Sequence, residues 1–271
     1  MMTYFYDSDL DRGEVYIPVG NSSIKRSKRS GEGVHLLEEK LDIPYTRDLV
    51  ERPRLFDLLS KSIEQFSATL ISGRAGTGKT ALAASFTKTQ EHTAWYSIEP
   101  SDVEWNVFIN YFAASVVRAT GSKTRISKLV PDAAEATQST MANSLINIFA
   151  EVETELIHKP LLIVLDGIHH LFDAPWFGEF FGLLLSSLPE NTNLLLLCRS
   201  KPPSPLWRLR SKQQLNVIDE KLLAFNLTET AELASITGLK RSDAERVHAE
   251  TFGRISKLLQ VVPRKTAGSR R

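Results

Sequence analysis

One stretch of the chain has the residue types and the spacing of a phosphate-binding loop. It reads Gly73-Arg74-Ala75-Gly76-Thr77-Gly78-Lys79-Thr80, the pattern G-x-x-x-x-G-K-[ST]. Glycines let the backbone wrap a polyphosphate so that its N–H groups point inward. Lys79 is predicted to reach the β- and γ-phosphates, and the Thr80 hydroxyl to ligate Mg²⁺. These eight residues and Ala81 form the predicted cofactor-binding set; the alternative is a glycine-rich turn that binds nothing.

A second stretch, residues 160–166, is an apolar run that ends in the carboxylate of Asp166. A continuous apolar run is typical of a strand buried on both faces. In open α/β sheets the site lies at the carboxyl ends of the strands. Asp166 is therefore predicted to hold Mg²⁺ through its water shell, the Walker B role. Thr80 and Asp166 are the predicted metal residues.

A third apolar run, residues 193–200, also ends in a charged residue, Arg199. An arginine at the end of a strand on the same sheet edge can reach a γ-phosphate and report whether it is present. The alternative is a surface ion pair. Lys79, Asp166 and Arg199 are thus the predicted catalytic residues.

These side chains need elements that bring them to one edge of a sheet. Strands are predicted at 68–72, 93–98, 160–166 and 193–200, and a short one near 222–225. One helix is predicted to begin at Pro53 and another directly after the phosphate loop. Further helices are predicted over residues 138–158, 177–188, 242–251 and 254–262. Asn226 and Glu229 are predicted to form a capping box at the start of one more helix. The alternation of strands and helices predicts an α/β fold, a parallel sheet with helices on both faces, followed by a small helical cap.

Three regions are expected along the chain. Residues 1–45 are predicted to form a poorly ordered basic arm, because the run 25–31 is rich in Lys, Arg and Ser. Residues 46–225 are predicted to form the nucleotide-binding domain, and residues 226–271 the helical cap with a basic tail.

Composition limits the possible classes of function. The chain has 271 residues, 42% of them hydrophobic, and a net charge of +1. This balance gives no global field that would recruit nucleic acid or an acidic membrane. The single cysteine, Cys198, excludes an internal disulfide, and no apolar run is long enough to span a bilayer. We expect a soluble cytoplasmic protein with no membrane partner, for which nucleic acid is not a specific ligand.

Taken together, these features resemble the nucleotide-binding module of the signal-transduction ATPases with numerous domains, the STAND class. The resemblance spans about residues 43–259 and is closest to regulators of the maltose-regulon-activator type and the large ATP-binding LuxR-type transcription regulators. It implies an AAA+/STAND-like P-loop NTPase fold. Residues 49–55 resemble the family segment that lies against adenine, which implies that Arg52 binds the nucleotide. Residues 161–169 resemble the family's Walker B run, and Arg199 matches its sensor arginine.

Two departures from that family matter. Gly167 stands where the family has a second acid, which orients or activates the attacking water. Losing a general base costs about 10²- to 10⁴-fold in rate, so we predict tight ATP binding with very slow turnover, unless Glu99 substitutes. Residues 228–271 also show no helix–turn–helix with a basic recognition helix, and specific DNA binding is not predicted.

The predicted function is an ATP–Mg²⁺-binding signalling module that acts as a nucleotide-dependent switch. Its output in transcription or signalling would be a contact with a protein partner or with a second copy, set by whether ATP or ADP is bound. Adenine is expected because no guanine-reading motif is present. One alternative is a non-hydrolysing ATP-binding adaptor, which Gly167 favours. Another is a P-loop small-molecule kinase with an arginine-rich lid at 199–210, although three prolines there predict a rigid connector.

Overall fold

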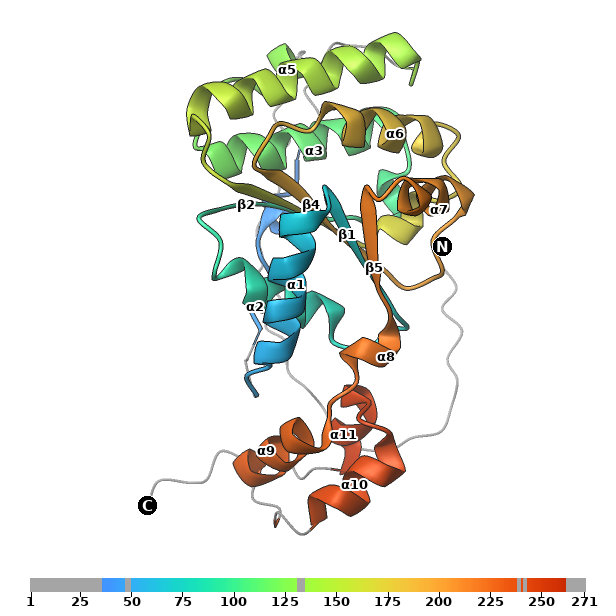
Figure 1. Ribbon diagram of the computed structural model, residues 1–271. Coiled ribbons are helices and arrows are strands. Elements are labelled where there is room, and N and C mark those ends of the chain that lie inside the picture. Colours follow the sequence, from blue (N-terminus) through green and yellow to red (C-terminus); the bar gives the residue numbers. More distant parts are fainter. Residues whose placement is uncertain (1–35, 47–49, 131–134, 238–239, 241–242, 262–271) are drawn as a thin grey trace, which may run out of the picture. The chain divides into compact units, whose positions relative to one another are not determined.

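A five-stranded parallel sheet positions the loop. The computed structural model describes residues 36–46, 50–130, 135–237, 240 and 243–261. The strands are β1 (Ala68–Ser72), β2 (His92–Ser97), β3 (Leu161–Asp166), β4 (Thr192–Cys198) and β5 (Leu215–Ile218). Their order is β2-β3-β4-β1-β5, and every neighbouring pair is parallel (Figure 1). The predicted α/β fold is confirmed.

Helices connect and follow the strands. They are α1 (Pro53–Gln65), α2 (Lys79–Thr87), α3 (Trp105–Thr120), α4 (Ile126–Leu129), α5 (Gln138–Leu156), α6 (Phe177–Ser187), α7 (Ser204–Ser211), α8 (Glu220–Leu223), α9 (Leu227–Thr237), α10 (Ala244–Thr251) and α11 (Ile255–Val261). Three 3-10 turns, η1 (Glu38–Leu41), η2 (Pro100–Asp102) and η3 (Ile168–Leu171), complete the described elements. No helix within the described ranges is both long and apolar enough to cross a membrane.

Helices cover both faces of the sheet. Successive residues of a strand point to opposite faces, so each strand contributes side chains to both layers of the core. On β3, Leu162 and Val164 pack with residues of α1 and α2 in one core cluster. Leu161, Ile163 and Leu165 pack with residues of α3, α5 and α6 in another. A strand covered on both faces needs an apolar residue at every position. This explains the apolar run before Asp166.

Two local signals in the sequence correctly mark helix starts. Pro53 is the first residue of α1, where its missing N–H costs nothing. At the start of α9, the Glu229 backbone N donates to Asn226 Oδ1 at 2.8 Å, and the Asn226 backbone N donates to Glu229 Oε2 at 3.0 Å. This is the predicted capping box, and it holds Glu229 in place for contacts described below.

Two element predictions are wrong. The last described strand is β5, residues 215–218, and the first two residues of the stretch 222–225 predicted as a strand belong instead to the single turn α8 (Glu220–Leu223). The Asp219 side chain caps that turn, accepting from the backbone N of Lys221 at 2.9 Å and of Leu222 at 3.3 Å. The segment predicted as a rigid connector contains helix α7, because prolines are tolerated in a first helical turn.

The end of the predicted basic arm is packed, at residues 38–41. Lys40 and Leu41 are buried, and Lys40 Nζ lies 2.6 Å from Asp102 Oδ1 and 2.8 Å from Glu99 Oε2. The prediction of a poorly ordered arm is therefore wrong for residues 38–41. The basic run 25–31 and the basic tail lie outside the described residues.

Candidate nucleotide-binding site

The phosphate-loop sequence forms a tight turn between the end of β1 and the start of α2. Gly76 and Gly78 have φ of 74° and 86°, the left-handed region that favours glycine. Gly73 is tied to the neighbouring strand, since its backbone N donates to the Cys198 carbonyl at 3.2 Å. Arg74, Ala75 and Gly76, which lie between the strand and the helix, are exposed residues.

The Lys79 ammonium folds back over the loop. Its Nζ donates to the Gly73 carbonyl at 2.5 Å, to the Arg74 carbonyl at 2.9 Å and to Thr77 Oγ1 at 3.3 Å. The residue is only 7% exposed, and burial lowers its pKa, while the nearby carboxylate of Asp166 opposes that shift. A desolvated cation with weak neutral partners is well prepared for an anion.

Thr80, in the first turn of α2, and Asp166, the last residue of β3, are brought together by the fold. Thr80 Oγ1 donates to Asp166 Oδ2 at 2.7 Å. Burial raises the pKa of Asp166, and the Thr80 hydrogen bond and the charges of Lys79 and Arg199 act against the rise. A hydroxyl and a carboxylate are hard oxygen ligands of the kind Mg²⁺ prefers, so this pair fits the ion. Within the described residues no group of three or more His, Cys, Asp or Glu side chains could hold a metal.

Arg199 follows β4 and is exposed. Its charge contributes to lowering the pKa of both Lys79 and His169, which puts the guanidinium within electrostatic range of the loop. His169, on η3, also belongs to this neighbourhood: burial lowers its pKa to about 4, and its Nδ1 has no hydrogen-bond partner in the described part of the chain.

Gly167 adopts a conformation that excludes a side chain. Its φ is 90°, and a Cβ built on it would lie 2.5 Å from the Ile98 carbonyl oxygen. An acid at this position would therefore require the backbone to move. Glu99, the suggested substitute, is held by Lys40 at 2.8 Å with its side chain 59% exposed.

Gly167→Ala is expected to lower the free energy of unfolding by about 2 kcal/mol or more, because strained φ and a backbone contact add together. Urea denaturation measures the loss. Gly121→Ala is the matched control: Gly121 has φ of 72° but nothing within 4 Å of its built Cβ. Equal losses in the two variants would show that the Ile98 contact has no effect.

An apolar pocket of about 570 Å³ lies beside the loop. Gly78, Ala81 and Ser85 line it from the loop and α2, and its larger apolar lining residues are Val50, Pro53, Phe56, Leu82, Phe225, Ile255 and Leu259. Such a pocket, next to a phosphate loop, has the size and chemistry for a flat aromatic base.

Arg52 lines this apolar pocket, but its guanidinium is engaged with the start of the helical region. Its Nη2 donates to the carbonyls of Leu223 at 2.8 Å and Ala224 at 3.1 Å and lies 3.2 Å from Glu229 Oε2. The guanidinium carbon is 4.2 Å from the Phe225 ring centroid. Its Nε has no hydrogen-bond partner among the described residues. A contact between Arg52 and the nucleotide stays a prediction.

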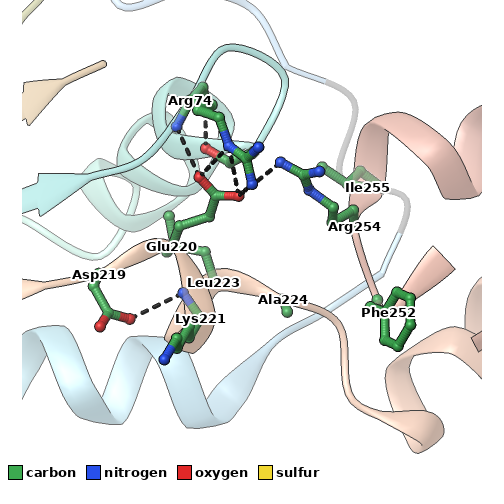
Figure 2. Close-up of a pocket in the computed structure, with 11 residues that line it drawn as sticks. Arg74, Asp219, Glu220, Lys221, Leu223, Ala224, Phe252, Arg254 and Ile255 are labelled. Atoms are coloured by element: carbon green, nitrogen blue, oxygen red, sulfur yellow. Dashed lines mark hydrogen bonds and ion pairs between the residues drawn. The ribbon is translucent and has the colours of Figure 1, made fainter. Parts of the chain in front are cut away.

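Arg74 lines a second pocket, of about 520 Å³. Residues of α8 and of the start of α11 also line this pocket (Figure 2). Its guanidinium is paired with Glu220, which also meets Arg254. Sequence reasoning missed Glu220 and Arg254. Neither belongs to a local motif, and only the fold brings them to the loop.

Comparison with known proteins supports a nucleotide-binding ATPase domain. The family described as the AAA ATPase domain matches residues 49–197. A solved Walker-type ATPase of Pyrococcus abyssi is similar with a TM-score of 0.51 and 12% identity, over 78% of this chain and 66% of that one, a likeness that shows the fold alone. The Orc1 protein of Aeropyrum pernix, solved in complex with DNA, gives a TM-score of 0.45 and 16% identity over 80% and 59%. This chain thus spans less than two thirds of the length of either. Because the family match covers more than half of the chain, the protein belongs to the AAA ATPase domain family.

Proposed function

We propose that this protein binds ATP with Mg²⁺ and works as a slow, nucleotide-dependent switch. One observation carries the proposal: the 2.7 Å hydrogen bond from Thr80 to Asp166, beside the buried ammonium of Lys79. It joins the loop to the strand end that would face the metal. A glycine-rich turn without a ligand gives no reason to bury a lysine against its own carbonyls.

Each predicted catalytic residue has a distinct role in this proposal. Lys79 exchanges the Gly73 and Arg74 carbonyls for β- and γ-phosphate oxygens, which are stronger partners for an ammonium. Thr80 and Asp166 would hold Mg²⁺, which when bound neutralises the charge of the β- and γ-phosphates. Arg199, exposed and in electrostatic range of Lys79, contacts the γ-phosphate and so distinguishes ATP from ADP. The apolar pocket takes adenine.

Slow turnover follows from the surroundings of Gly167. That position cannot carry an acid without backbone movement, and Glu99 is held by Lys40. The same two observations favour the alternative, a non-hydrolysing ATP-binding adaptor, in which the nucleotide stabilises the fold by mass action. The slow switch and the adaptor differ in whether bound ATP is hydrolysed. A P-loop kinase is the third candidate, and its lid would be the arginine-rich segment 199–210, which contains helix α7.

The output of the switch is proposed to be a protein contact, with a partner or a second copy. The sequence resemblance to STAND-class regulators motivates this step, and it motivates a role in transcription or signalling in the cytoplasm. Helices α9–α11 are the proposed moving part, because Phe225, Ile255 and Leu259 line the pocket assigned to adenine. A ligand that contacts both the loop and these helices favours the conformation in which they meet.

Asp166→Asn tests the metal part of this function. Titration calorimetry with ATP, in Mg²⁺ and in EDTA, should show that the wild type binds about tenfold more tightly or better with Mg²⁺ and that Asp166→Asn loses most of this gain. Asp173→Asn, at an exposed aspartate beyond η3, is the control. Equal binding in Mg²⁺ and EDTA by the wild type would refute the metal site, and no binding at all would refute the function.

A further inference from the structure

Helix α7 and the residues before it carry a concentration of positive charge. The helix follows β4 and lies beside α6 and β5 (Figure 1). Residues 199–218 include no Asp or Glu. Their basic side chains are all exposed and are Arg199, Lys201, Arg208, Arg210 and Lys212. In the described part of the chain none of these cations takes part in an ion pair. Together with Trp207 they form what we call the α7 surface.

An aromatic side chain lies among these charges. At 3.6 residues per turn, Trp207 falls between Arg208 and Arg210 on the exposed face of α7. The Arg210 guanidinium carbon is 5.0 Å from the Trp207 ring centroid, and the tryptophan is 40% exposed. Leu206 points the other way and is buried in the core. The helix therefore presents an indole flanked by two arginines.

The α7 surface is fixed in one conformation by its own chain. Pro202 is buried and Pro203 is the N-cap of α7, so the entry into the helix has restricted φ angles. At the other end, Ser211 Oγ donates to the Trp207 carbonyl at 3.2 Å, and the Lys212 backbone N donates to the Arg208 carbonyl at 3.2 Å. A ligand that binds a preformed surface loses less free energy to ordering.

The net charge of the whole chain, +1, hides this local excess. Cations on an ordinary solvated face alternate with carboxylates, which are missing here. A strand of nucleic acid matches the pattern, because its phosphates pair with spaced cations and its bases stack on an aromatic ring. Unpaired bases are needed for such stacking, which favours a single strand over a duplex. An acidic membrane fits less well, since membrane-surface helices present a broad apolar face and Trp207 is the large apolar side chain that the described part of α7 exposes.

We propose that the α7 surface binds single-stranded nucleic acid independently of its sequence, with phosphates on the cations and a base stacked on Trp207. The proposal does not depend on nucleotide binding at the phosphate loop. Arg199 belongs to this surface and also lies within electrostatic range of that loop, so the strand and the nucleotide would occupy neighbouring sites.

Fluorescence anisotropy of the full chain with a labelled oligothymidine of about 12 nucleotides tests the proposal. The wild type should bind with a Kd of about 1–100 μM at physiological salt and more tightly at low salt. Trp207→Ala should weaken binding about tenfold and leave the salt dependence unchanged, because stacking is lost and no charge is removed. Trp207→Phe keeps an aromatic ring and should retain most of the affinity.

Arg208→Gln should produce the complementary result. We expect about fivefold weaker binding at low salt, together with a slope of log K against log salt that is smaller by about 0.7, the value for one phosphate contact to a single strand. Lys61→Gln, at an exposed lysine on α1, is the charge-matched control and should bind like the wild type.

Tryptophan fluorescence gives a second readout at the same residue. The other tryptophans, Trp95, Trp105 and Trp176, are at most 7% exposed. Quenching by bound bases should therefore come from Trp207 and disappear in Trp207→Phe, although that variant still binds the oligonucleotide.

The proposal is overturned if the wild type does not bind the oligothymidine, or if it binds a duplex of the same length as tightly. Wild-type affinity in Trp207→Ala, or in Arg208→Gln, would also overturn it. Stronger binding to phosphatidylserine vesicles than to the oligonucleotide would identify a membrane surface as the ligand instead. Circular dichroism checks the fold of each variant; if Trp207→Ala is unfolded, Arg208→Gln and the quenching of the wild type decide.

Discussion

Lys79→Ala is expected to lower the affinity for ATP by about a hundredfold or more, the loss typical of removing one partner from a buried, charged contact. The effect is large because Lys79 is buried and its charge is already stripped of water. Nothing else in the loop replaces it: Arg74 is paired with Glu220, and the loop's other contacts come from backbone groups and hydroxyls.

Calorimetry with ATP and Mg²⁺ measures this loss, and Lys61→Ala, at an exposed lysine on α1, is the control. The melting temperature should change little, because the three acceptors left by Lys79 are loop oxygens that water can reach once the side chain is gone. Binding of ATP by Lys79→Ala with wild-type affinity would contradict the assignment of the loop.

Gly253→Ala is expected to lower the free energy of unfolding of the helical region by about 3 kcal/mol or more, the largest single-residue effect on stability that we foresee. Gly253 has φ of 67°, and a Cβ built on it would lie 2.0 Å from the Phe225 carbonyl oxygen. The two residues are also joined by the hydrogen bond from the Phe225 backbone N to the Gly253 carbonyl, at 2.8 Å. The Cβ therefore requires this pair of backbones to separate.

The consequence reaches the proposed adenine pocket, because Phe225 lines it and lies against the Arg52 guanidinium. We expect faster hydrogen exchange over residues 225–261 together with weaker ATP binding. Gly182→Ala on α6 is the contrasting control, since nothing lies within 4 Å of its built Cβ and alanine in a helix is stabilising by about 0.5–1 kcal/mol. Wild-type stability of Gly253→Ala would mean that the close approach to Phe225 is not required.

The sequence predicts those parts of the site that depend on neighbours along the chain. The loop residues, the apolar run that ends at Asp166 and the strand before Arg199 are local patterns, and parallel strands bring their ends to one edge. The Asn226–Glu229 capping box is local in the same way. The predicted strand ends and the capping box agree with the structure because each depends on a few consecutive residues and one packing rule.

Contacts between residues far apart in the chain could not be predicted from the sequence. Glu220 reaches Arg74 and Arg254, and Lys40 reaches Asp102, only after the chain has folded. Strand β5 was missed because its four residues include Asn216 and are only partly buried. The more apolar stretch that follows β5 begins with the turn α8 instead, because the Asp219 side chain caps the start of that turn. Tertiary context and one side-chain cap outweighed the local pattern there.

The most direct test of the central claim is a single-turnover experiment with protein in excess over labelled ATP and Mg²⁺. Bound ATP and released phosphate are followed together, for the wild type and for Lys79→Ala. The account predicts that the wild type retains ATP and converts it slowly, whereas Lys79→Ala neither retains nor converts it. Retention of unconverted ATP for hours would make the protein a non-hydrolysing binding module. Failure of the wild type to retain ATP at all would contradict the account at its first step.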